Sequence, residues 1–113
     1  MIITLKGNSD LKHYQTLFTQ ITEEYQSRFA YSKLFRNMLE DLTVTIRSTD
    51  SMSEPLDGYY MTGAFEMWIF MKEGACVSEK SFAFTAAHEL THAYLDSLND
   101  NLKIYDVDLP DFF

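Results

Sequence analysis

The chain has 113 residues, of which 46% are hydrophobic, and its formal net charge at pH 7 is −8. This composition is typical of a folded protein, and the length suits a single domain, residues 1–113, with one modest core. The negative charge repels nucleic-acid phosphates, so we expect neither DNA nor RNA as a partner.

Targeting signals are also missing from the sequence. No apolar run approaches the roughly 20 residues that cross a bilayer, so no membrane association is expected. The N-terminus lacks the basic and apolar regions of a signal peptide. The single cysteine, Cys76, cannot form an internal disulfide, which fits a reducing compartment. We therefore expect a cytoplasmic protein in which Cys76 is a small buried hydrophobe.

The first third of the chain predicts a short strand followed by helix. Residues 2–5 form a β-branched run that is typical of an edge strand. Ser9 or Asp10 is a candidate N-cap for the helix that follows. Apolar residues then recur at spacings of three and four: Leu11, Tyr14, Leu17, Phe18, Ile21, Tyr25 and Phe29. The same period resumes over residues 31–42, either as a second helix or as a continuation bent near Ser32.

The middle of the chain predicts a small sheet. Residues 42–48 alternate between apolar and polar side chains, which indicates a strand with one wet face. A polar loop covers residues 49–57, and Asp57 with Gly58 marks a turn. Residues 59–61 and 65–71 then read as two further strands, the second rich in aromatic side chains.

The last predicted element is a long helix over about residues 79–99, capped by Ser78 or Ser81. It contains the run TAAHELTHAYLD, and within it the H-E-x-x-H pattern of His88, Glu89 and His92. Residues four apart lie on one face of a helix, so both imidazoles can bind one metal ion. Glu89 is then placed to act as a base on a water molecule in an open coordination position. The pattern predicts a Zn²⁺ site with hydrolytic chemistry.

The residues around this pattern resemble those of the zincin metallopeptidases. The variable and flanking positions hold only uncharged residues, as in that family: Thr85, Ala86, Leu90, Thr91 and Ala93. The run HELTHA followed by Asp96 is similar to the active-site helix of thermolysin-type gluzincins. The element order also resembles the small single-domain minigluzincins. The resemblance implies a zinc-dependent peptidase, active or latent, that acts on a peptide or protein.

The same resemblance implies a fold. We expect an α+β, zincin-like domain with N-terminal helices, a three- to four-stranded, mainly antiparallel sheet and the motif helix at the C-terminal end. In zincins an edge strand of the sheet holds an extended peptide above the metal. We expect Trp68 and its neighbours on strand 65–71 to align the substrate here, with Tyr94 or Tyr105 as candidate hydrogen-bond donors to the oxyanion.

The third metal ligand departs from the gluzincin pattern. Gluzincins supply a glutamate after the motif helix, and this chain has no Glu after Glu89. Asp96 lies roughly 6 Å along the helix axis from His92, which suits packing better than ligation. A chain that returns from a helix end near Asn99 needs three to five extended residues to reach the metal. This reach favours Asp106, with Asp108 as the alternative.

A second class of function is a non-catalytic binding protein. An acidic, compact domain with a zincin-like fold can block a host factor, as inhibitors of phage or mobile-element type do. The two hypotheses differ in one residue's role, because a peptidase needs the carboxylate of Glu89 and a binding protein does not. Composition and spacing leave the substrate and the oligomeric state open.

Overall fold

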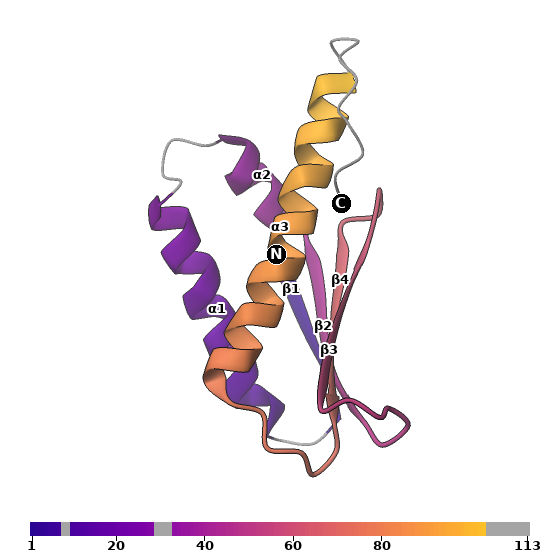
Figure 1. Cartoon of the computed structure of the whole chain (residues 1–113). Helices are drawn as coiled ribbons and strands as arrows, with labels where there is room; N and C mark the ends of the chain where they lie inside the picture. Colours follow the sequence, from indigo (N-terminus) through magenta and orange to yellow (C-terminus); the bar gives the residue numbers. More distant parts are fainter. Residues whose placement is uncertain (8–9, 29–32, 104–113) are drawn as a thin grey trace.

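The computed structural model describes residues 1–7, 10–28 and 33–103, and for residues 99–103 it describes the backbone alone. It has three helices that lie together on one face of a four-stranded sheet (Figure 1). The elements in chain order are β1 (Ile2–Lys6), α1 (Leu11–Arg28), α2 (Lys33–Asp41), β2 (Thr43–Thr49), β3 (Leu56–Met61), β4 (Glu66–Lys72) and α3 (Glu79–Lys103). The α+β class expected from the sequence is confirmed.

The helices follow the predicted periods closely. The apolar stripe of α1 buries Leu11 and Phe18, and that of α2 buries Phe35, Met38 and Leu39. The second period therefore forms a helix of its own, while the junction around Ser32 lies outside the described residues. α3 begins where expected, because the Ser78 hydroxyl accepts a hydrogen bond from the Ser81 amide at 3.1 Å and so caps the first turn.

The sheet is mixed, so the expectation of a mainly antiparallel sheet is not confirmed. The strand order is β1-β2-β4-β3, with β1 and β4 both parallel to β2 and only β3 antiparallel to β4. The crossover through α1 and α2 makes the first pair parallel. The loop over residues 50–55 is long enough to carry the chain past one strand position, so β4 takes the inner place beside β2. Its uninterrupted apolar sequence suits that place, and the Gly-containing β3 suits an edge.

Two local predictions about single residues are wrong. Asp57 and Gly58 do not form a turn, because both belong to β3. Cys76 is exposed rather than buried, since it lies in the connection between β4 and α3 and not in an element that faces the core. In the described part of the chain, no helix is long and apolar enough to span a membrane.

The core lies between the sheet and the helices. Alternate residues of β2 and β4 point into it, and each helix adds one buried face. Its largest fully buried side chains are Phe18, Phe82, Met38, Leu42, Ile46, Met67, Ile69 and Leu90. Burial of this kind contributes about 25 cal/mol for each Å² of apolar surface, which is the main term holding α3 against the sheet.

A buried polar contact fixes how α3 lies against the sheet. The carboxylate of Asp96 on α3 accepts hydrogen bonds from the Tyr60 hydroxyl at 2.7 Å and from the Gly63 amide at 2.8 Å. Gly63 adopts a φ of 84° in the turn between β3 and β4, a conformation that glycine tolerates without strain. The contact ties α3 to the β3–β4 hairpin, which agrees with the packing role expected for Asp96.

We predict that Asp96→Ala lowers the free energy of unfolding by about 1–3 kcal/mol, because it leaves a buried hydroxyl without its acceptor. Denaturant unfolding of Asp96→Ala, Tyr60→Phe and the double variant measures the coupling between the two side chains. Tyr59→Phe is the matched control, since Tyr59 is 53% exposed and its loss of a hydroxyl should change stability by no more than about 0.5 kcal/mol. Strictly additive effects of Asp96→Ala and Tyr60→Phe would contradict the contact.

Candidate metal centre

The H-E-x-x-H pattern lies in the middle of α3, where the helix is regular and packed against the sheet. The spacing of four residues brings the Nε2 atoms of His88 and His92 to 3.1 Å from each other. The two rings meet edge to face, with centroids 4.7 Å apart. Two imidazole nitrogens on one tetrahedral zinc ion lie roughly 3.3 Å apart, given Zn–N bonds of about 2.05 Å. The pair therefore fits the donor arrangement of a shared metal ion.

Glu89 occupies a different environment from the two histidines. His88 is exposed and His92 half-buried, whereas Glu89 is only 5% exposed. Burial raises the pKa of the Glu89 carboxyl and the nearby charge of Asp57 raises it further, while His92 and His88 lower it. Among the described residues no hydrogen bond or ion pair reaches this carboxylate. Such a group is poised to take up a proton, as a general base must.

The edge strand β3 closes over Glu89 because Gly58 has no side chain. A Cβ atom at position 58 would lie 2.8 Å from Glu89 Cγ and 2.9 Å from both Glu89 Oε1 and Thr85 Cγ2. Real Cβ atoms essentially never approach so closely, so a larger residue at position 58 would force the side chains of Glu89 and Thr85 to shift. Gly58 thus allows the backbone of β3 to pass directly beside the motif helix.

A cleft of about 320 Å³ opens at this junction. It is lined by Gly58, Tyr59, Tyr60, Thr62, His88, Glu89 and His92. One wall is the edge strand and the turn that follows it, and the other is the exposed face of α3. The three motif residues therefore share one solvent-accessible space with an open sheet edge.

The third metal ligand is not found in the described part of the chain. There, no group of three His, Cys, Asp or Glu side chains is placed to hold a metal ion. Asp96 is engaged by the hairpin instead. The predicted ligands Asp106 and Asp108 lie outside the described residues. The described chain supplies two nitrogen donors and a neighbouring carboxylate.

Trp68, which the sequence predicted to align a substrate, does not face the motif helix. Trp68 lies on β4, an inner strand, and it alternates with Met67 and Ile69, which are fully buried in the core under the helices. Its side chain therefore stands on the opposite face of the sheet from α3, stacked on Phe70 with ring centroids 5.8 Å apart. The strand beside the cleft is β3.

The two tyrosines predicted as oxyanion donors do not enter the cleft in the described structure. Tyr94 packs its ring on Phe35 of α2, with centroids 5.6 Å apart, because it lies on the core side of α3. Tyr105 falls outside the described residues. Tyr59 and Tyr60 line the cleft instead. The sequence places these two tyrosines between a polar loop and a turn. It does not predict the order of the strands that makes β3 an edge strand.

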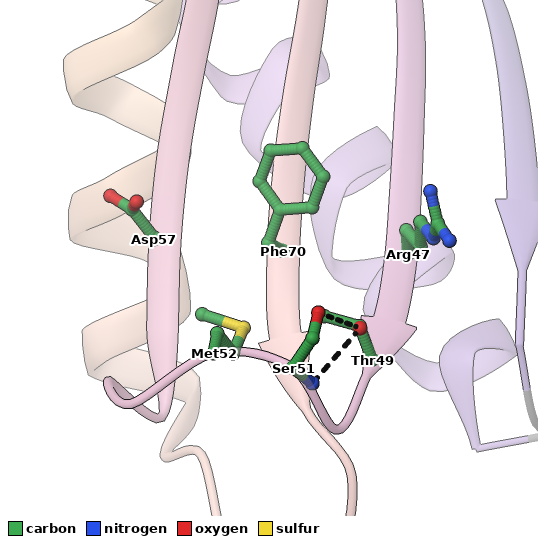
Figure 2. Close-up of a pocket in the computed structure, with 6 residues that line it drawn as sticks. All are labelled: Arg47, Thr49, Ser51, Met52, Asp57 and Phe70. Atoms are coloured by element: carbon green, nitrogen blue, oxygen red, sulfur yellow. Dashed lines mark hydrogen bonds between the residues drawn. The ribbon is translucent and has the colours of Figure 1, made fainter.

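A second hollow, of about 240 Å³, lies away from the motif on the outer face of the sheet. It is lined by Arg47, Thr49, Ser51, Met52, Asp57 and Phe70. Figure 2 shows Phe70 standing between Asp57 on β3 and Arg47 on β2, with the helices behind the strands. No side chain of the H-E-x-x-H motif lines this hollow.

Comparison of the chain with protein-family models, with curated proteins and with solved structures finds no match. The cluster of His88, Glu89 and His92 is therefore the feature from which a function can be inferred.

We predict that Glu89→Gln makes the metal-free protein more stable at neutral pH. The raised pKa means that the folded protein holds the Glu89 proton more tightly than the unfolded chain does. Ionisation at neutral pH therefore costs stability, and this cost disappears when the pH falls below the ordinary range of a carboxyl group. Thermal unfolding in the presence of chelator at several pH values measures the difference.

The matched control is Glu23→Gln, which removes an exposed carboxylate from α1. It should leave the unfolding temperature nearly unchanged at every pH. Two results would contradict the view that a buried, ionised Glu89 lowers stability at neutral pH. One is a Glu89→Gln protein that unfolds at a lower temperature than the parent at neutral pH. The other is an increase in unfolding temperature that is just as large at low pH.

Proposed function

We propose that the protein is a zinc-dependent metallopeptidase in which His88 and His92 hold the metal ion and Glu89 is the general base. The observation that carries the proposal is the 3.1 Å approach of the two Nε2 atoms in the same cleft as a buried carboxylate. The motif's resemblance to the zincin active-site helix supports the same conclusion. A structural His pair would need neither the adjacent carboxylate nor the open cleft.

The chain's own residues have separate tasks in this proposal. His88 and His92 would present neutral nitrogens as ligands, since the metal competes with their protons. Bound there, zinc supplies a Lewis acid that polarises a carbonyl group and lowers the pKa of a water molecule to about 7. Glu89 accepts the proton of that water and later donates it to the leaving amine, a task that suits a carboxyl with a raised pKa.

The edge strand β3 gives the proposed substrate its orientation. An extended peptide can add to an exposed sheet edge through main-chain hydrogen bonds, while its side chains alternate between two faces. In this fold such a peptide would run beside Gly58 and Tyr59 and past Glu89, because these residues line the same cleft. This arrangement favours a peptide or protein substrate in an extended conformation.

We predict that the protein binds about one zinc ion per chain and that His88→Ala or His92→Ala abolishes this binding. Elemental analysis after gel filtration measures the stoichiometry, and thermal unfolding gives a second readout. Free zinc at a hundred times its dissociation constant should stabilise the fold by about 2.7 kcal/mol. Of the two predicted third ligands, either Asp106→Asn or Asp108→Asn should weaken binding without abolishing it.

His13→Ala is the control for this experiment. His13 is the only other histidine, and it lies on α1, where its Nε2 is 3.2 Å from a Glu79 carboxylate oxygen. Its loss should leave the zinc stoichiometry unchanged. Wild-type protein that takes up no zinc, or equal zinc binding by the parent and the His88→Ala variant, would refute the proposed centre.

We predict that Glu89→Gln keeps the zinc ion but loses peptide hydrolysis by a factor of roughly 10² or more, because an amide cannot accept the water's proton. The assay follows cleavage of a peptide library by mass spectrometry, with equal zinc loading of both proteins. The alternative function, a non-catalytic acidic binding protein, predicts that Glu89→Gln leaves activity in its biological assay intact. That outcome, with wild-type protein inert on every peptide, would favour the alternative.

A further inference from the structure

The outer face of the sheet lies opposite the three helices (Figure 1), and of its exposed side chains only Tyr59 also lines the cleft of the proposed metal centre. The three most exposed apolar side chains on it are Ile2 (66%), Tyr59 (53%) and Met61 (40%). Trp68 and Phe70 are half-buried and stack on each other at the middle of this face. Exposed apolar surface of this extent on a small domain indicates a contact with another molecule.

The charges on this face are separated across the strands. Lys6 on β1 and Arg47 on β2 are the cations of one half, and the other half holds the carboxylates of Asp57 on β3 and Glu66 on β4, with Lys72 as a further cation at the end of β4. Lys6, Arg47 and Asp57 belong to the same face, because the registers pair Lys6 with Arg47, Arg47 with Phe70 and Phe70 with Asp57 in a single row. Glu66 shares this face because it alternates with the buried Met67 along β4. No ion pair among the described residues involves any of them.

This arrangement is complementary to itself under a twofold rotation. An axis parallel to the strands, between β2 and β4, places β1 of one copy opposite β3 of the other and β2 opposite β4. In the row described above, Lys6 then faces Asp57 of the second copy, and Arg47 faces Phe70. Sheets that pack face to face keep their strand directions within about 30°, so long side chains still reach their opposite positions.

The same twofold rotation also gives compatible pairs in the next two rows of the sheet. In the central row Trp68 faces Thr45, and in the last row Ile2 faces Met61, an apolar pair. The hollow of about 240 Å³ on this face is lined by Phe70 together with the same copy's Arg47 and Asp57, which stand on opposite sides of the ring (Figure 2). The Arg47 of the second copy would lie over the Phe70 ring, and a guanidinium over an aromatic ring is a favourable contact.

We propose that this outer face is the contact between two copies of the chain in a twofold-symmetric dimer. An isologous contact requires that one surface be complementary to itself, and the pairs of Lys6 with Asp57 and of Ile2 with Met61 that the rotation makes provide this. The projected area of four strands by six residues is on the order of 400 Å² per copy, which places the interface at the small end of specific contacts. The dimer is therefore reversible and depends on protein concentration, and it leaves the face of α3 with the two histidines open.

Sedimentation velocity over a wide concentration range tests the proposal on the full chain. The wild-type protein should pass from the monomer mass of 13.2 kDa to twice that value as concentration rises. Trp68 is the only tryptophan, so its emission should shift to shorter wavelength over the same range. Protein that stays monomeric up to its solubility limit, with constant emission, would overturn the proposal.

Charge reversal identifies the surface. Lys6→Asp places two carboxylates opposite each other and should raise the dimer dissociation constant roughly tenfold or more. Adding Asp57→Lys restores the opposite charges and should restore the dimer, and a mixture of the two single variants should form a mixed dimer. Lys12→Asp on α1 makes the same change of charge away from this face and should leave the dimer unchanged. A Lys6→Asp protein that dimerises as well as the parent, or a double variant that stays monomeric, would overturn the proposal.

Discussion

The contact between the motif helix and the edge strand is the constraint on which the candidate centre depends. α3 approaches β3 so closely that no side chain fits at Gly58, where a Cβ atom would lie 2.9 Å from the Glu89 carboxylate oxygen. Further along the helix, Asp96 fixes the other end of the same strand through Tyr60 and Gly63. With the helix fixed against the strand, the two histidines lie at the mouth of the cleft and the glutamate at its base.

This contact buries a carboxylate at a cost in stability. Glu89 is buried, and among the described residues no hydrogen bond or ion pair compensates for its lost hydration, so burial raises the pKa of its carboxyl. A residue chosen for packing alone at this position would be apolar, as Leu90 beside it is. Retention of an ionisable group in a destabilising environment is typical of functional sites, and a nearby bound cation would favour its charged form.

The sequence predicted most of the elements because their patterns are local. The periods of α1 and α2, the cap at Ser78 and the motif helix all depend on residues within a few positions of each other. The H-E-x-x-H spacing also determined which two imidazoles meet, since the geometry of a helix is the same in every fold. The core sides of α1 and α2 followed from the same periods.

The order of the strands could not be predicted in this way. Whether β4 or β3 lies beside β2 depends on tertiary packing, and a loop of six residues permits both arrangements. This ambiguity explains why the sequence predicts strand 65–71, with Trp68, beside the cleft. The turn predicted at Asp57 and Gly58 has a different cause, because that dipeptide favours turns whatever the order of the strands. The burial of Cys76 was misjudged for a related reason, because it was inferred from residue type without a periodic pattern to place it.

Zinc X-ray absorption spectroscopy on the wild-type protein tests the central claim most directly, because it reports the atoms bound to the metal. Carboxylates on a surface with a net charge of −8 can bind zinc nonspecifically, so stoichiometry alone is a weaker test. The geometry of His88 and His92 predicts two imidazole nitrogens at about 2.0–2.1 Å, with lighter oxygen ligands completing the shell. A spectrum with oxygen ligands alone, and no scattering from imidazole rings, would contradict the assignment of this helix as a metal centre.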